Sequence, residues 1–281
     1  MPVRLAHNNY GKSAVRLVKV ARAGGRHDLH ELSVAVSLEG DFESAHAKGD
    51  NSKVLPTDTM KNTVYALAKD HPLHSIESFA AHLGRHFVST VPHVANASIS
   101  IGQVSWDRLS FDGRPHSHAF AKGSAERQTC KVGVSRSGAT VQAGMQDLVL
   151  LKTTDSAFSG YLKDRYTSLK ETRDRILATS VTAQWDYDGA ALDFSAARAA
   201  VRNTLVRTFA HHKSESVQQT LYAMGEAALV ACLHCRRISL SLPNKHCLLV
   251  DLSPFGLSNE NEIFVPTDEP FGLIEAVVER A

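Results

Sequence analysis

Residues 51–62 have the sequence Asn-Ser-Lys-Val-Leu-Pro-Thr-Asp-Thr-Met-Lys-Asn, and the rest of the chain is organised around this stretch. Pro56 favours an extended approach at Leu55 and a turn at itself. Asp58 or Thr59 is predicted to be a helix N-cap, because the apolar residues that follow share one helical face. A hydroxyl and unpaired backbone N–H groups at a helix N-terminus suit a small anionic ligand, although an isolated Thr-Asp pair is usually an ordinary cap.

Composition places the chain among globular proteins. It has 281 residues, of which 43% are hydrophobic and 21% charged, and this length allows one large domain or two smaller ones. The net charge of +2 and the lack of a basic run argue against a nucleic-acid partner. No apolar stretch reaches the roughly 20 residues of a membrane span, and no signal-peptide pattern is present. Four cysteines in this length indicate a reducing cytoplasm rather than a disulfide framework.

Periodic side chains predict further elements on both sides of residues 51–62. Residues 10–20 are rich in apolar and β-branched side chains, and residues 31–38 alternate with a period of two, as in half-buried strands. A second helix is predicted over residues 75–88, and strands are predicted at 97–106 and 130–135. The first half therefore has the predicted order strand, strand, helix, helix, strand, strand.

The second half repeats this order. Its six elements are predicted at residues 140–152, 181–188, 194–210, 216–232, 238–242 and 247–253. Ser216 and Gln219 have the spacing of a capping box, and a turn at residues 243–245 is predicted to join the last two strands. The repeated order indicates an internal duplication, with one unit over residues 1–137 and another over residues 138–281. Antiparallel strands with paired helices predict an α+β fold with helices on one sheet face.

Two features lie outside this repeat. Residues 156–179 are inserted into the second unit, and their pattern predicts no structure. The open sheet must have its edges covered or paired with another subunit, and a homo-oligomer that closes the sheets into a barrel is one solution.

Several ordered motifs resemble those of urate oxidase (uricase) along nearly the whole chain. The matching stretches are residues 10–12, 50–52, 57–65, 112–116, 151–154, 166–172, 174–177, 216–218 and 242–246. The resemblance implies a tandem tunnelling fold (T-fold) with two ββααββ units, and a homotetramer built around a β-barrel tunnel with active sites at subunit interfaces. It also implies oxidation of urate by O₂ and water to 5-hydroxyisourate and hydrogen peroxide, with neither a metal nor an organic cofactor.

The resemblance also implies substrate contacts. Arg175 matches the arginine that clamps one urate edge, where a planar guanidinium can make two parallel hydrogen bonds. Gln218 matches the residue whose amide offers the substrate a donor and an acceptor, and Val217 matches a position that contributes its backbone N–H. Phe158 matches the aromatic residue that stacks on the purine face.

Five further matches concern the opposite edge and the protons. Thr57 and Asp58 match residues that a neighbouring subunit supplies in the family. Lys12, Thr57 and His246 match the proton relay: a hydroxyl both donates and accepts, and histidine exchanges protons near neutral pH. Asn244 matches the residue that, with Thr57, holds O₂ or water above the ring. Taken singly, each of these residues has an ordinary structural interpretation, and the hypothesis depends on their joint occurrence inside the motifs.

Two alternatives remain open at the level of sequence. Cys232-Leu-His-Cys235, with Cys247 and His246 nearby, has the spacing of half a zinc site, and related T-fold enzymes include zinc-dependent pterin synthases. A purine-binding relative without turnover is the other alternative. Residues 156–160 are smaller than the commonest family version around the stacking phenylalanine, so pocket shape is expected to differ. Residues 279–281 lack the peroxisomal tripeptide of many eukaryotic members, which favours a cytoplasmic enzyme.

Overall fold

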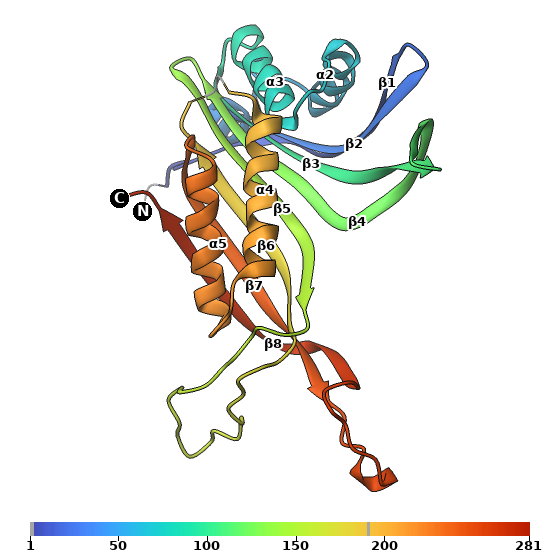
Figure 1. Ribbon diagram of the computed structural model, residues 1–281. Helices are drawn as coiled ribbons and strands as arrows, with labels where there is room; N and C mark the ends of the chain where they lie inside the picture. Colours follow the sequence, from blue (N-terminus) through green and yellow to red (C-terminus); the bar gives the residue numbers. More distant parts are fainter. Residues whose placement is uncertain (1–2, 190–191) are drawn as a thin grey trace. The chain divides into compact units, whose positions relative to one another are not determined.

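The computed structural model describes residues 3–189 and 192–281, which form eight strands, five α-helices and one short 3₁₀-helix (Figure 1). The strands are β1 (Tyr10–Ala23), β2 (Arg26–Gly40), β3 (Val94–Phe111), β4 (Arg114–Ser135), β5 (Gly138–Lys152), β6 (Leu177–Tyr187), β7 (Cys235–Leu249) and β8 (Phe264–Glu279). The helices are α1 (Glu43–Lys48), α2 (Thr57–Asp70), α3 (Ile76–Thr90), α4 (Phe194–His211), α5 (Val217–Ala231) and the 3₁₀-helix η1 (Ser253–Phe255).

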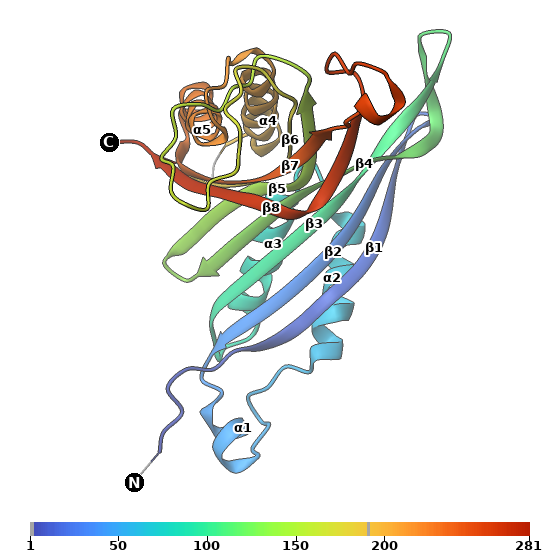
Figure 2. The same cartoon turned by 90° about the horizontal axis from the view of Figure 1, so that it is seen from below.

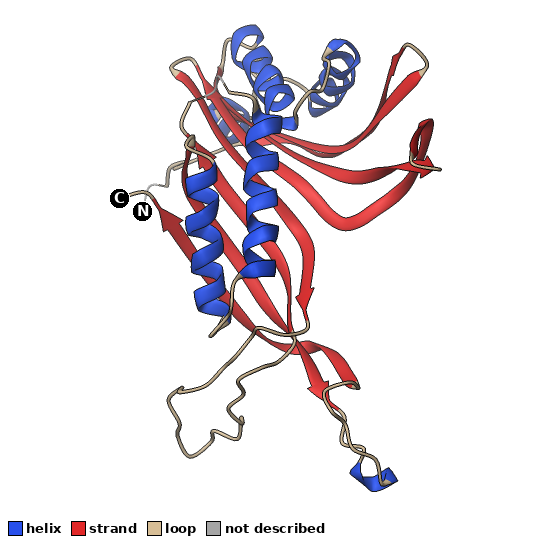
Figure 3. Cartoon of the chain, in the orientation of Figure 1, coloured by secondary structure: helices blue, strands red, loops and turns tan. Residues whose placement is uncertain are grey.

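The strands are hydrogen-bonded in chain order. The pairs β1–β2, β2–β3, β3–β4 and β7–β8 are antiparallel. Figure 3 shows the long strands in red, the helices in blue and a long loop between β5 and β6 in tan. The α+β class and the repeated ββααββ order are therefore confirmed, with α1 as an addition to the first repeat.

The chain divides into two compact units. Unit 1 consists of Met1–Met145 with Asp186–Arg198, and unit 2 consists of Gln146–Trp185 with Ala199–Ala281. A duplication boundary between residues 137 and 138 remains a prediction.

In unit 1, α2 and α3 cover one face of the strands (Figure 2). The alternation in β2 explains this arrangement, because Leu32, Val34 and Val36 are almost fully buried while the residues between them are more exposed. Helix α3 packs closely against this face. At Gly84, an added Cβ would lie only 2.5 Å from Cγ2 of Val134. A helical glycine therefore allows the helix to approach the sheet.

Unit 2 is built in the same way. Trp185 on β6 and Leu240 on β7 are buried, as is the face of α5 around Met224. A Cβ added to Gly225 of α5 would lie 2.7 Å from Cγ2 of Val278, just as one added to Gly84 would lie close to Val134 in unit 1. The two units thus repeat a packing detail as well as an element order.

Two local predictions are wrong. The N-cap of α2 is Pro56, not Asp58 or Thr59, and Thr57 is already the first helical residue. The side chain of Asp58 instead accepts hydrogen bonds from Lys61 and Asn62.

The predicted turn at residues 243–245 is also wrong, because β7 continues through it. Pro243 pairs with Leu273 of β8, and a register shift follows between Asn244 and His246. Proline is tolerated where such an irregularity interrupts the ladder. The strand that pairs with β7 is β8, whose residues are largely exposed in the chain and lack a clear apolar alternation, so its pattern does not predict a strand.

Candidate active site

Lys12 lies in β1 beside an irregularity of the sheet. The pairing of β1 with β2 shifts register between Lys12 and Val15, and Ala14 has a φ of 54°. The residue before Lys12 must be a glycine, because a Cβ added to Gly11 would collide with the carbonyl of Val36. A β-bulge of this kind bends the strand and redirects a side chain, and bulges are frequent next to active sites.

Thr57 and Asp58 occupy the first turn of α2, and both are exposed. The hydrogen bond from Lys61 is the main reason why the pKa of Asp58 lies below its usual value, and the charge of Lys12 contributes in the same direction. The backbone N–H of Leu55 donates to the hydroxyl of Tyr10 at 2.9 Å, which ties the approach to this helix to the start of β1. The candidates in unit 1 are therefore the Lys12 ammonium on β1 and, at the N-terminus of α2, the Thr57 hydroxyl and the Asp58 carboxylate.

Arg175 and Phe158 come from the loop between β5 and β6. The guanidinium carbon of Arg175 lies 5.4 Å from the centroid of the Phe158 ring. Burial lowers the pKa of Arg175, and its Nε is buried with no hydrogen-bond partner among the described residues. A buried donor without an acceptor costs about 1–3 kcal/mol, so this atom is suited to an acceptor supplied by a ligand.

The preceding residue, Asp174, fixes the loop that carries both side chains. Its carboxylate accepts hydrogen bonds from the hydroxyl of Thr154 at 2.8 Å and from the backbone N–H of Ser156 at 3.4 Å. Phe158 and Thr172 exchange backbone hydrogen bonds of 2.8 and 3.0 Å. The inserted segment therefore has a defined backbone even though its sequence pattern predicts none.

Val217 and Gln218 are the first two residues of α5. Ser216 is the N-cap, and its hydroxyl accepts from the N–H of Gln219 at 3.2 Å, as predicted. The side chain of Gln219 reaches back to the N–H of Glu215 at 2.8 Å. The N–H groups of Val217 and Gln218 belong to the first turn and have no acceptor within the helix. The Val217 side chain is buried and the Gln218 side chain is exposed.

Asn244 and His246 lie in β7 on either side of its register shift with β8. Asn244 is opposite Gly272 and His246 is opposite Thr267, whose hydroxyl donates to the His246 carbonyl at 3.4 Å. Lys245, between them, forms an ion pair of 2.6 Å with Asp268. As at Lys12, a strand irregularity positions candidate catalytic side chains.

A family model described as Uricase matches residues 8–133 and 141–275. The chain belongs to the uricase family. The uricase of Arthrobacter globiformis is 45% identical over 99% of this chain and 90% of its own length, and the uricase of Aspergillus flavus is 38% identical over 97% and 95%. The crystal structure of the Arthrobacter globiformis uricase has a TM-score of 0.94 and covers 100% of this chain and 96% of that one. The urate oxidase of Bacillus sp. TB-90, at 19% identity and a TM-score of 0.83 over 97% of this chain and 100% of its own, shares the fold.

Uricase-family membership makes the chain an oxidoreductase with a tandem T-fold, as the motifs predict. The structure brings Phe158 and Arg175 into contact, and it places Val217 beside Gln218 and Asn244 close to His246 on shared elements. In unit 1, the charge of Lys12 acts on Asp58.

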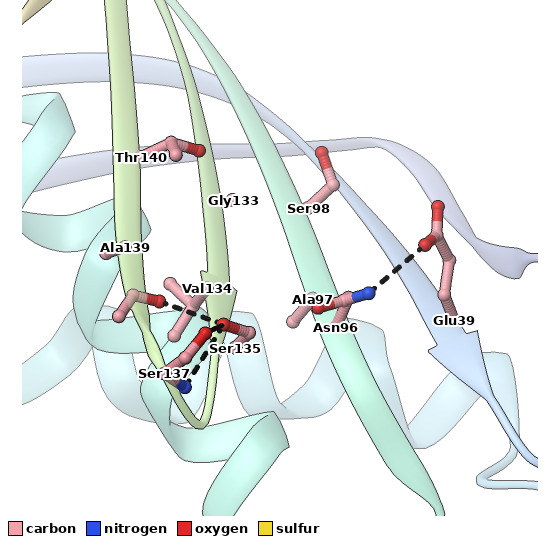
Figure 4. A pocket seen from close by; sticks show the side chains of 11 residues that line it. Glu39, Asn96, Ala97, Ser98, Gly133, Val134, Ser135, Ser137, Ala139 and Thr140 are labelled. Atoms are coloured by element: carbon pink, nitrogen blue, oxygen red, sulfur yellow. Dashed lines mark hydrogen bonds between the residues drawn. The ribbon is translucent and has the colours of Figure 1, made fainter.

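Three cavities of this uricase-family chain lie away from the candidate residues. One of about 500 Å³ is lined by serine and threonine hydroxyls together with Glu39 and Asn96 (Figure 4). Another of about 590 Å³ lies at the starts of α3 and α4 and is lined by His71, His74 and His82. A third of about 450 Å³ lies on β6, β7 and β8. None of the nine candidate residues lines these three cavities.

The cysteine motif gives no support to the zinc alternative. Cys232 and Cys235 are both buried, and burial, followed by the hydrogen bond with Cys232, raises the pKa of the Cys235 thiol. Within residues 3–189 and 192–281, no group of three histidine, cysteine or acidic side chains is arranged to hold a metal ion. The same residues contain no helix with the length and apolar character needed to cross a membrane.

Proposed function

We propose that this uricase-family chain oxidises urate with O₂ and water to 5-hydroxyisourate and hydrogen peroxide, using neither a metal nor an organic cofactor. The observation that carries the proposal is Arg175, whose buried Nε has no acceptor within the described chain and whose guanidinium lies over the Phe158 ring. Urate is flat and anionic. Its edge supplies acceptors for a guanidinium, and its face supplies an aromatic surface for stacking.

The substrate clamp lies in unit 2. Arg175 holds one urate edge through paired N–H groups, and Phe158 stacks on the ring face. The Gln218 amide donates and accepts on the same flat molecule, while the Val217 N–H donates from the first turn of α5. The N-terminus of a helix favours a negative charge by about 0.3–1 kcal/mol, which adds to the charge of Arg175.

The opposite edge of urate is held by Thr57 and Asp58 of a neighbouring subunit. We therefore propose a homotetramer with active sites at subunit interfaces, and the exposure of Thr57, Asp58 and Gln218 supports it. Lys12, Thr57 and His246 form the relay that removes a proton from bound urate. The Thr57 hydroxyl passes the proton on, and with Asn244 it holds O₂ or water above the ring.

Two further parts of the proposal concern organisation and location. The chain consists of two duplicated T-fold units, residues 1–137 and 138–281. The enzyme acts in the cytoplasm, in the degradation of urate toward allantoin.

The first experiment follows the ultraviolet absorbance of urate and the formation of peroxide with purified, metal-stripped protein in air. We expect one peroxide for each urate consumed. Arg175→Ala should abolish most of this turnover, whereas Arg173→Ala, which removes a neighbouring exposed arginine, should leave it near the wild-type rate. Binding of urate without consumption would favour the non-catalytic alternative, and loss of activity on chelation would favour a metal.

A further inference from the structure

The loop that carries Phe158 bends at Gly160, two residues after it. The sequence is Phe158-Ser-Gly-Tyr161, and Gly160 has a φ of 69°. A positive φ is a conformation for which glycine is strongly favoured. The bend allows the side chains of Phe158 and Tyr161 to meet.

The two aromatic rings that meet across this bend are stacked. The centroids of Phe158 and Tyr161 are 4.8 Å apart, and the ring planes differ by 15°. Tyr161 is half-buried, although residues 162–170 that follow it are all exposed. Tyr161 therefore folds back onto Phe158 rather than extending with the rest of its loop.

The Tyr161 ring is itself held in place from the far side of the loop. Its hydroxyl donates to the carbonyl of Leu169 at 2.6 Å. The ammonium of Lys163 lies 5.6 Å from its ring centroid and forms an ion pair of 2.7 Å with Glu171. A hydrogen bond and a cation–π contact thus fix the orientation of Tyr161.

The backbone of Phe158 is anchored by its exchange of hydrogen bonds with Thr172, but this anchoring leaves the ring free to rotate about its side-chain bonds. We infer that Tyr161 is a positioning residue for urate: by stacking on the Phe158 ring, it sets the plane in which that ring meets the substrate. This inference rests on the proposed function of Phe158. Tyr161 itself does not touch the substrate.

The test is steady-state urate oxidation by Tyr161→Ala, Tyr161→Leu and Tyr161→Phe. Offset stacking between aromatic rings contributes enough to binding that Tyr161→Ala should raise KM about 2- to 12-fold, with kcat nearly unchanged. Tyr161→Leu keeps a bulky side chain at this position but has no aromatic face, so the same rise in KM is expected. Tyr161→Phe keeps the ring and should stay within about 2-fold of the wild-type KM.

Tyr166→Ala is the matched control, because Tyr166 lies in the same loop but its ring contacts Arg165. Its KM should be unchanged. An unchanged KM in both Tyr161→Ala and Tyr161→Leu would overturn the inference while leaving the proposed function intact. A rise in Tyr161→Phe equal to that in Tyr161→Ala would also overturn it, since the hydroxyl rather than the ring would then set the position. Failure of the wild-type protein to consume urate would be a failure of the proposed function, and it is measured before any variant is compared.

Discussion

The starts of α3 and α5 have the same local structure but present different side chains. Ser75 caps α3 by accepting from the N–H of Ser78 at 3.1 Å, as Ser216 caps α5. A buried aliphatic residue follows each cap. The next residue is Glu77 in α3 and Gln218 in α5.

Glu77 and Gln218 differ in burial. Glu77 is only 1% exposed and is paired with the buried Arg198, whose guanidinium also donates to the carbonyls of Gly144 and Thr129. Gln218 is exposed. The same helix start is therefore buried and ion-paired in unit 1 and exposed in unit 2.

The largest difference between the two helix starts is expected in stability. Glu77→Ala removes a carboxylate partner of the buried Arg198, and removing one partner of a buried ion pair typically costs about 3–5 kcal/mol. Gln218→Ala removes an exposed amide and should change the free energy of unfolding by less than about 0.5 kcal/mol. Urea unfolding of both variants at one protein concentration measures the contrast. Equal losses would show that the two helix starts have the same role.

The next effect concerns turnover and rests on the proposed urate site. Gln218→Ala removes hydrogen bonds to a charged substrate, each worth about 1.5–3 kcal/mol, so kcat/KM should fall about 10- to 150-fold. Gln218→Glu should be worse, because a carboxylate would face an anion. Gln219→Ala is the control: it removes the hydrogen bond to Glu215 and should leave kcat/KM unchanged. A normal kcat/KM in Gln218→Ala would remove this residue from the substrate clamp.

A smaller effect tests the packing that the two units share. Gly84→Ala and Gly225→Ala push a methyl group against Val134 and Val278, respectively. Overpacking costs about 1–3 kcal/mol, and the better helix propensity of alanine returns about 1 kcal/mol. Both variants should therefore lose between about 0 and 2 kcal/mol. Adding Val278→Ala to Gly225→Ala should cost less than the sum of the two single variants. Strict additivity would mean that the two side chains do not compete for space.

Most elements of the fold could be predicted from the sequence, because one face of each is buried. Apolar residues alternate with polar ones around Val34 and around Ala183 because only one strand face is buried. The apolar face of α3 is buried in the same way. Strand β8 could not be predicted in this way, since its side chains are mostly exposed in the chain. Pro243 indicated a turn, but the irregular pairing beside it allows the strand to continue.

For the candidate site, too, the sequence predicts some features and not others. Its residues were found from ordered motifs, which record residue types and order but not contacts. The pairing of Glu77 with Arg198 joins residues far apart in the chain, and no local sequence pattern predicts it. The stack of Tyr161 on Phe158 did have a local signal, the Gly160 between two aromatic residues, which is suggestive only once its positive φ is known.

The smallest effect is expected from a histidine that ends α2 in unit 1. Burial, together with the nearby His82, Lys19 and His74, lowers the pKa of His71 from 6.5 to about 4, and its Nδ1 accepts from the N–H of Leu73 at 3.0 Å. Between these two pKa values the unfolded chain binds a proton that the folded chain does not. The free energy of unfolding therefore falls as pH is lowered from about 6.5 toward 4.

His71→Asn removes the titrating ring but keeps an acceptor near Leu73, so part of this acid-dependent loss should disappear. The effect should be modest, because His71 is half-exposed and solvent screens its charge. Urea unfolding at pH 7 and pH 5, for the wild-type protein and the variant, gives the difference. At pH 7 His71 is largely neutral in both states, so its titration contributes little there. A loss between pH 7 and pH 5 that is as large in His71→Asn as in the wild-type protein would assign the acid sensitivity to other groups.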